Sequence, residues 1–363
     1  MSGRPLCLGF IAIAVLVVVI AGYAVVDIKK FQLYGGKTPF ASVAREYHDT
    51  WSIMKQTYRT STANSFYVAD DLTPNMAEQA LKVLAYAPLE DPEKFKIRIM
   101  VVCGQHGREY VSSEVCYNLI RLLQVNVREE VFTPKIAEFL QEGVGFFIVP
   151  VANPWARTLV ETNSTRQCQR TNKNGVDLNR NFLHKSAYEF MRGSRSKYSD
   201  DGMSQEDDPG PAPMSEYETL AMGEYLSYVN PHLLINIHSG GKDILMPYDC
   251  TFDTLPPYYG VMMRLAMHVR DRACPKCSVG TGASSLYPAF GTLVDYALDF
   301  IGVQLAYTFE IYASPKIKND HGLTNDECKV YFNPPAGDEL LEVVRRWIAV
   351  ILVMTDRLLE ITV

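Results

Sequence analysis

The sequence lacks the excess of basic residues that nucleic-acid-binding proteins carry. Its 35 Lys and Arg are outnumbered by 41 Asp and Glu, and the formal net charge is -6. Phosphate binding needs a basic stripe, so we expect no nucleic acid among the partners. The sequence also has no internal repeat, Ser/Gly-rich linker or long block of like charges. These absences favour one large domain, over residues 41–363, and we expect it to be a monomer.

Long uncharged runs are also missing, with one exception at the N-terminus. No charged residue stands between Leu6 and Val26, a run of 21 residues, which is long enough to cross a bilayer as a helix. Residues 1–30 are therefore interpreted as a signal-anchor that inserts residues 6–26 into a membrane, or as a signal peptide cleaved near Ala24. The first alternative predicts a single-pass membrane protein of the secretory pathway or cell surface, and the second a secreted protein. Residues 31–40 would form a tether.

Eight cysteines fit the oxidising compartment that either alternative implies. Cys103 and Cys116 lie in apolar segments and are interpreted as buried thiols. The remaining cysteines after the N-terminal run lie near loops, where disulfides are expected with the pairing left open: Cys168, Cys250, Cys274, Cys277 and Cys328. The sequon Asn163-Ser-Thr165 would be glycosylated only on a lumenal or extracellular surface.

Four apolar runs predict strands that are buried on both faces, because their hydrophobicity is continuous and does not alternate. They are Ile97–Gly104, Val144–Asn153, Leu233–Ser239 and Leu305–Tyr312. Helix-like segments lie between and after them: Tyr110–Val125, Ile136–Glu142, Ser215–Val229, Tyr258–Arg272 and Gly337–Thr362. The alternation predicts a doubly wound α/β sheet, whose ligands bind beyond the carboxyl ends of the strands.

Candidate metal ligands follow two of these strands. His106 and Glu109 come directly after the first strand, and His238 ends the third. Two imidazoles and one carboxylate form a ligand set of catalytic zinc, with the fourth position left for water. No His-Glu-x-x-His occurs in the sequence, which excludes the helix-borne metalloprotease motif.

Further polar residues are candidates for catalysis and for binding a ligand. Glu310 ends the fourth strand, where a carboxylate is costly to bury without a task, and it could act as a general base. Asn179 and Arg180 could bind a terminal carboxylate, since guanidinium and carboxylate share two parallel hydrogen bonds. Arg170 could stabilise an oxyanion. Asp177 could orient a ligand histidine through the ring nitrogen that does not bind metal.

Together these motifs resemble the zinc metallocarboxypeptidases related to pancreatic carboxypeptidase A, peptidase family M14. The order and spacing match over most of the chain from about Tyr47 onward. The matching motifs are Gln105-His-Gly-Arg-Glu109, Asn153-Pro154, Gly175-Val-Asp-Leu-Asn-Arg-Asn-Phe182, Ile237-His-Ser239 and Tyr307-Thr-Phe-Glu-Ile311. Longer runs, such as Pro209-Gly-Pro-Ala-Pro-Met-Ser-Glu216, look most like plant and protist members. The resemblance implies an α/β/α fold with a mixed eight-stranded sheet and helices on both faces.

The resemblance also implies roles at individual positions. One Zn²⁺ per chain would be bound by His106, Glu109 and His238. Peptide hydrolysis would then use Glu310 as base, Arg170 on the scissile carbonyl, Asn179, Arg180 and Tyr287 on the substrate's terminal carboxylate, and Asp177 behind His106. The substrates would be the C-termini of peptides or proteins.

The side-chain preference depends on a register that the sequence leaves open. The alignment places Val294 at the pocket, which predicts apolar or aromatic C-terminal residues. A shift by one residue would place Asp295 there, and an acid favours Lys or Arg because an apolar pocket leaves their charge unpaired. Two other functions stay open: a related zinc amidohydrolase that acts on an unusual amide or isopeptide, and a non-catalytic, membrane-anchored binding protein.

Overall fold

The computed structural model describes residues 92–123, 133–185, 207–318 and 322–362. The predicted membrane segment over residues 1–30, the tether over residues 31–40 and the predicted start of the domain at residue 41 lie outside these ranges. In the part of the chain that is described, no helix is both long enough and apolar enough to span a bilayer.

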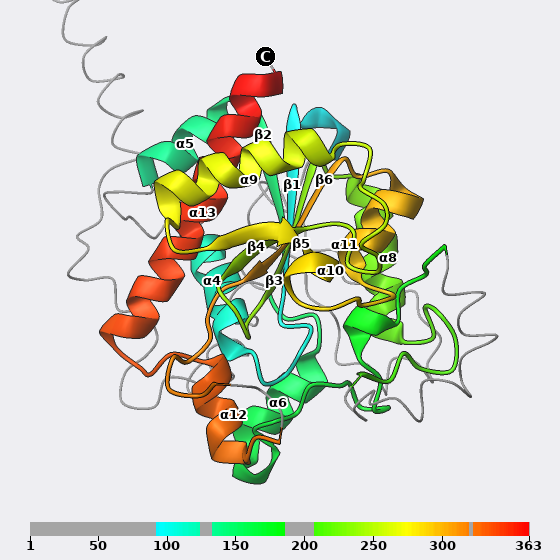
Figure 1. The fold of residues 1–363 in the computed structure, drawn as a ribbon. Helices are drawn as coiled ribbons and strands as arrows, with labels where there is room; N and C mark the ends of the chain where they lie inside the picture. Colours follow the sequence, from blue (N-terminus) through cyan, green and yellow to red (C-terminus); the bar gives the residue numbers. More distant parts are fainter. Residues whose placement is uncertain (1–91, 124–132, 186–206, 319–321, 363) are drawn as a thin grey trace, which may run out of the picture.

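A mixed six-stranded sheet lies at the centre of the described residues (Figure 1). Its strand order is β2-β1-β3-β6-β4-β5. The strands are β1 (Ile97–Cys103), β2 (Val144–Val149), β3 (Leu233–His238), β4 (Asp243–Met246), β5 (Ser278–Thr281) and β6 (Leu305–Glu310). Strands β2, β1, β3 and β6 run parallel, while β4 pairs antiparallel with β6 and parallel with β5.

Helices cover both faces of this sheet, so the predicted α/β architecture is confirmed (Figure 1). One face packs on α4 (Tyr110–Leu123), α5 (Thr133–Gln141), α9 (Tyr259–Ala273) and α13 (Asp338–Thr362). The other face packs on α8 (Tyr217–Val229) and α11 (Leu293–Tyr296). Strand β1 shows the reason, since Ile99 and Val101 belong to the first layer while Met100 and Val102 belong to the second. The described residues supply six strands, so the expected count of eight stays a prediction.

Shorter elements lie between these strands and helices in the chain, and one precedes β1. They are η2 (Pro92–Lys94), α6 (Pro154–Thr162), η3 (Ser164–Arg166), η4 (Leu178–Arg180), α10 (Gly282–Ser285), the π-helical turn η6 (Ala297–Ile301) and α12 (Asn325–Phe332). Helix α12 begins with a capping box, in which Thr324 and Glu327 bond reciprocally to each other's backbone N–H.

Three disulfides join described cysteines, and the interpretation of two of them as thiols was wrong. Cys103, at the end of β1, is bonded to Cys116 in α4, because the helix that follows the strand packs back across it. The other pairs are Cys168–Cys328, which links the segment after η3 to α12, and Cys274–Cys277. Cys250 is a buried free thiol, so the expectation of a disulfide there was also wrong.

Candidate metal centre

The predicted metal ligands meet at the carboxyl ends of the central strands. His106 and Glu109 lie in the turn between β1 and α4, and His238 is the last residue of β3. The turn begins at Gly104, whose φ of +68° and close contact with Ser113 leave no room for a side chain. His238 pairs in register with Glu310, the last residue of β6. The sheet thus brings together residues that are more than 200 positions apart.

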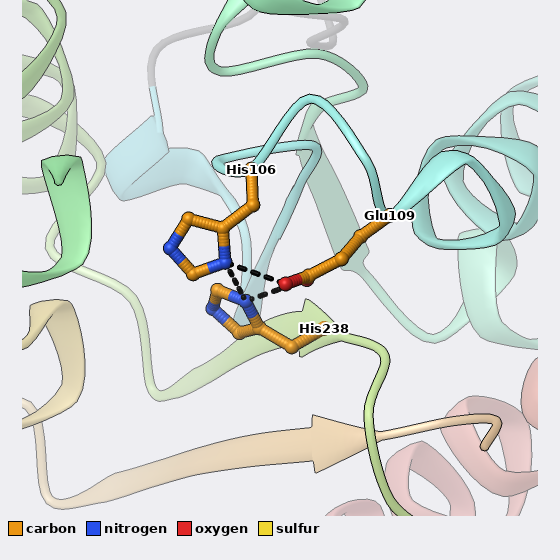
Figure 2. A group of neighbouring side chains, drawn as sticks. All are labelled: His106, Glu109 and His238. Carbon is orange, nitrogen blue, oxygen red and sulfur yellow. Dashed lines mark hydrogen bonds and ion pairs between the residues drawn. The ribbon is translucent and has the colours of Figure 1, made fainter. Parts of the chain in front are cut away.

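The three donor groups face one another, as Figure 2 shows. His106 Nδ1 lies 2.7 Å from Glu109 Oε1, and His238 Nδ1 lies 3.0 Å from Glu109 Oε2. The two Nδ1 atoms are 3.2 Å apart. Burial alone would raise the pKa of Glu109, but the two histidines hold it well below its usual value. Burial lowers the pKa of His238, which favours the neutral imidazole that a metal requires.

This arrangement fits zinc. Ligands that are roughly 2.0–2.2 Å from a tetrahedral zinc lie roughly 3.3–3.5 Å from one another. The three donor separations, 2.7, 3.0 and 3.2 Å, are slightly shorter than this. Two nitrogens and one carboxylate leave one coordination position for water or substrate, as in catalytic zinc sites.

Asp177 lies against the first histidine, on the side away from the other candidate ligands. His106 Nε2 lies 3.0 Å from Asp177 Oδ1, so the carboxylate favours the proton on Nε2 and a free lone pair on Nδ1. Asp177 is fully buried, and its other oxygen accepts a hydrogen bond of 2.7 Å from Arg170 Nε. Burial would raise the pKa of Asp177, but Arg170 and then His106 lower it well below its usual value.

Gln105 performs the same task for the second histidine, and the sequence analysis missed it. Its Oε1 lies 3.1 Å from His238 Nε2 and also accepts a hydrogen bond from Asn236 Nδ2. The carbonyl oxygen therefore favours the His238 tautomer whose Nδ1 is free for metal. The available signal was its place beside His106 at the end of a buried strand, because a polar residue there must find a partner.

Glu310 lies beside these ligands with one oxygen unused. Its Oε2 is buried and has no hydrogen-bond partner among the described residues. Gly240 lies next to this oxygen, since a Cβ there would be in ordinary van der Waals contact with Oε2, at 3.6 Å. Burial is the main cause that raises the pKa of Glu310 well above its usual value, followed by the charges of Glu109 and Asp243. An unpaired buried carboxylate at a metal site can take up a proton.

The predicted substrate-binding residues line the same region. Arg170 Nη1 lies 3.1 Å from His106 Nδ1, next to the ligands. Arg180 Nη2 donates to the Tyr287 hydroxyl at 3.1 Å, and Tyr287 is 53% exposed. Asn179 is buried and accepts a hydrogen bond from Leu293 N at 3.0 Å. A guanidinium and an exposed phenol therefore lie together near the ligands.

The two candidates for the side-chain preference have different surroundings. Val294 is fully buried in the apolar layer between the sheet and α8. Asp295 accepts hydrogen bonds from the backbone N–H groups of Asp249, at 3.0 Å, and Cys250, at 3.2 Å. The predicted preference for apolar residues stays a prediction.

Comparison with known proteins agrees with this fold. Residues 76–341 match the family model described as "Zinc carboxypeptidase". Carboxypeptidase B of Rattus norvegicus is 28% identical over 230 residues, which cover 60% of this chain and 52% of the relative. Mast cell carboxypeptidase A of Homo sapiens is 27% identical over 226 residues, with 59% and 51% coverage. The chain thus spans about half the length of the curated relatives it matches.

Solved structures share the fold at low sequence identity. Bovine thrombin-activatable fibrinolysis inhibitor, in complex with tick carboxypeptidase inhibitor, matches with a TM-score of 0.63 at 19% identity. The match covers 87% of this chain and 96% of that one. Carboxypeptidase A from Helicoverpa armigera gives a TM-score of 0.60 at 19% identity, with 85% and 73% coverage. The family model matches well over half of the chain, and the resemblance seen in the motifs is confirmed. The chain belongs to the zinc carboxypeptidase family, peptidase family M14.

Proposed function

We propose that this protein is a zinc-dependent metallocarboxypeptidase that hydrolyses the C-terminal peptide bond of peptides or proteins. The observation that carries the proposal is the convergence of His106, Glu109 and His238 beside Glu310, whose buried Oε2 has no hydrogen-bond partner in the described part of the chain. Zinc bound by the three ligands would supply a Lewis acid and lower the pKa of a water molecule to about 7. We infer one zinc per chain at this site.

The chain's own residues would then move the proton and fix the substrate. Glu310 would accept a proton from the attacking water at its free Oε2 and return it to the leaving amine. Arg170, which lies against the ligands, would stabilise the negative charge that develops on the carbonyl oxygen. Asn179, Arg180 and Tyr287 would bind the terminal carboxylate, and Arg180 can do so with two parallel hydrogen bonds. This last interaction favours an exopeptidase.

The two alternatives find less support. A non-catalytic binding protein has no need of a buried carboxylate without a partner, which is costly to fold. An amidohydrolase that cleaves an unusual amide or isopeptide stays possible in chemical terms, because such substrates also carry a carboxylate. Substrate comparison separates it from the main proposal.

We also propose that the protein enters the secretory pathway, and that residues 6–26 anchor it in a membrane unless they are removed near Ala24. The three disulfides support an oxidising compartment, since such bonds rarely persist in a reducing cytosol. We propose a monomer. Sugar on Asn163 would support lumenal or extracellular exposure. A domain found on the cytosolic side by protease protection would contradict it.

The decisive experiment measures release of the C-terminal residue from blocked dipeptides by the purified full chain. We expect turnover that 1,10-phenanthroline abolishes, with one zinc per chain. Glu310→Gln should lower kcat by at least about 100-fold and still bind zinc. The control Glu142→Gln, an exposed residue just before β2, should behave as wild type. Near-normal turnover by Glu310→Gln would refute the mechanism, and folded wild-type protein without affinity for zinc would refute the function.

A further inference from the structure

A second pair of acidic side chains lies close to the proposed active site and takes no part in the mechanism above. Asp249 follows β4, and Asp295 belongs to α11. They are in direct contact, because the backbone N–H of Asp249 donates to Asp295 Oδ1 at 3.0 Å. Their side chains are buried, with 7% and 1% of the residue surface exposed. Two carboxylates buried side by side repel each other unless a positive charge or a proton separates them.

The described part of the chain does not provide that positive charge by direct contact. No ion pair between described residues ends on Asp249 or Asp295, although Asp207 and Asp299 each pair with a basic residue. Burial raises the pKa of Asp249 to about 6, against smaller opposing effects of Thr292 and Arg180. Burial and the charge of Asp249 raise the pKa of Asp295 well above its usual value. A cation from outside the chain would therefore be electrostatically favourable beside this pair.

The pair lies beside the residues that we propose bind the substrate's carboxylate. Leu293 N donates to Asn179 Oδ1, and a Cβ on Gly291 would come within 2.1 Å of the Arg180 carbonyl oxygen. The segment that leads into Asp295 is thus packed directly on Asn179 and Arg180. The charge of Asp249 also raises the pKa of Glu310, and the charge of Arg180 lowers the pKa of Asp249. A residue whose carboxylate binds Arg180 and whose peptide bond reaches Glu310 has its side chain close to Asp249.

Space for the Asp249 carboxylate depends on Gly282. A Cβ at position 282 would lie only 1.8 Å from Asp249 Oδ1, so any larger residue would displace the carboxylate. Asp295 in turn holds the backbone of residues 249 and 250 through two accepted N–H bonds. The two residues therefore have different roles. Asp295 fixes the backbone of residues 249 and 250, and Asp249 offers its carboxylate for binding.

We propose that Asp249 binds the positively charged side chain of the substrate's C-terminal residue, so that the enzyme prefers peptides ending in Arg or Lys. The inference rests on the proposed carboxypeptidase function and names its substrate class. A guanidinium or ammonium group placed there gains a charge-assisted hydrogen bond and separates the two carboxylates. An apolar side chain would instead cover a buried charge and leave it without a partner. The preference thus opposes the one expected from Val294, whose side chain is enclosed in the apolar core.

A metal ion is the competing occupant of this place. His184, Cys250 and Asp295 offer donor atoms within 4.8 Å of one another. However, burial raises the pKa of the Cys250 thiol, and both Asp295 oxygens already accept backbone N–H bonds. A neutral thiol is a poor metal ligand. We therefore favour the organic cation and make the metal an outcome of the test.

The experiment compares kcat/KM for blocked dipeptides that differ only in the last residue: Arg, Lys, norleucine and Phe. Wild type should favour Arg or Lys over norleucine by about 100-fold, since a buried charged group is left unpaired by the wrong substrate. Asp249→Asn should lose most of that ratio through a fall in kcat/KM on the Arg and Lys substrates. Zinc content and Tm check that the variant is folded. A wild-type preference for norleucine or Phe, with Asp249→Asn leaving the ratio unchanged, would overturn the proposal but not the carboxypeptidase function.

A second measurement needs neither turnover nor a variant. Calorimetry on the zinc-loaded full chain should show tighter binding of free arginine than of norleucine by about 100-fold. Equal affinity would overturn the proposal even if every peptide were hydrolysed. Tight arginine binding without hydrolysis of any peptide would uphold the basic pocket and refute the proposed function. A second zinc per chain that is lost in Cys250→Ser would show that a metal is the counter-ion, and would also overturn it.

Discussion

Replacing Asp177 by Asn should disturb the orientation of His106, a proposed zinc ligand, and so weaken zinc binding. Asp177 Oδ1 accepts bonds from His106 Nε2 and from Asn179 N, while Oδ2 accepts from Arg170 Nε and Nη2. Asparagine has nearly the same shape as aspartate and keeps one acceptor oxygen. Its amide nitrogen would face the donors of Arg170 or of His106, because both sides of the native carboxylate are surrounded by N–H groups. The variant therefore loses the charge and at least one of these contacts.

Two magnitudes follow from this geometry. Loss of the partner that orients a ligand histidine weakens metal binding by about 10–100-fold, or about 1.4–2.8 kcal/mol. Arg170 also loses its nearest carboxylate, and removal of one partner from a buried pair costs about 3–5 kcal/mol. Glu109 and Asp207 remain at 3.7 Å from Arg170 and retain part of its stabilisation. We therefore expect metal-free Asp177→Asn to be destabilised by about 3 kcal/mol.

The assay has two parts. Zinc affinity is measured by competition with a chelator of known affinity, and stability by denaturant unfolding of the metal-free full chain. Asp253→Asn, at an exposed position, serves as the matched control and should change neither value. If Asp177→Asn bound zinc as tightly as wild type, the carboxylate would not control the His106 tautomer and our account of the metal centre would be wrong.

Three further predictions concern separate parts of the molecule. Gln105→Met should weaken zinc binding by about tenfold, since the His238 tautomer loses its acceptor, and wild-type affinity in the same competition assay would contradict this. Replacing Cys168 and Cys328 by Ser should cost about 3–5 kcal/mol in denaturant unfolding, because their bond closes a loop of 160 residues, and an unchanged midpoint would contradict it. Burial lowers the pKa of His232 below 6.5 in the folded protein, so the unfolded chain takes up the proton first as pH falls. The free energy of unfolding therefore decreases as the pH falls below that value. Between about pH 7.5 and 5 the Tm of wild type should thus fall more than that of His232→Gln, and parallel losses would refute the assignment.

Much of the fold could be predicted from the sequence because the central strands are continuously apolar. The four predicted strands correspond to β1, β2, β3 and β6, each extended in the prediction by one to four residues beyond its end. The extra residues, such as Gly104 after β1 and Ser239 after β3, lie where the backbone leaves the sheet. Strand β5 was missed because it has only four residues and is half exposed, so no apolar run marks it.

The convergence of the candidate ligands could be predicted for the same reason. His106 follows β1 and His238 ends β3, and these parallel strands are adjacent in the sheet, so their polar residues meet at the same edge. Gln105 was missed because its function depends on the ring nitrogen of His238 that the metal does not use. The Cys103–Cys116 bond was missed because strand and helix are close only after the helix has packed on the sheet.

Asp249 marks the limit of what the sequence could reveal, and the reason is strand β4. This four-residue strand was missed, yet it pairs antiparallel with β6 and places Asp243 opposite Glu310. The chain then runs on to Asp249, whose backbone is fixed by Asp295, 46 residues later. The sequence analysis considered only which residue of α11 occupies the pocket, Val294 or Asp295. The acid that we propose binds the substrate comes from a different segment, so the proposed preference depends on a tertiary contact that no local pattern encodes.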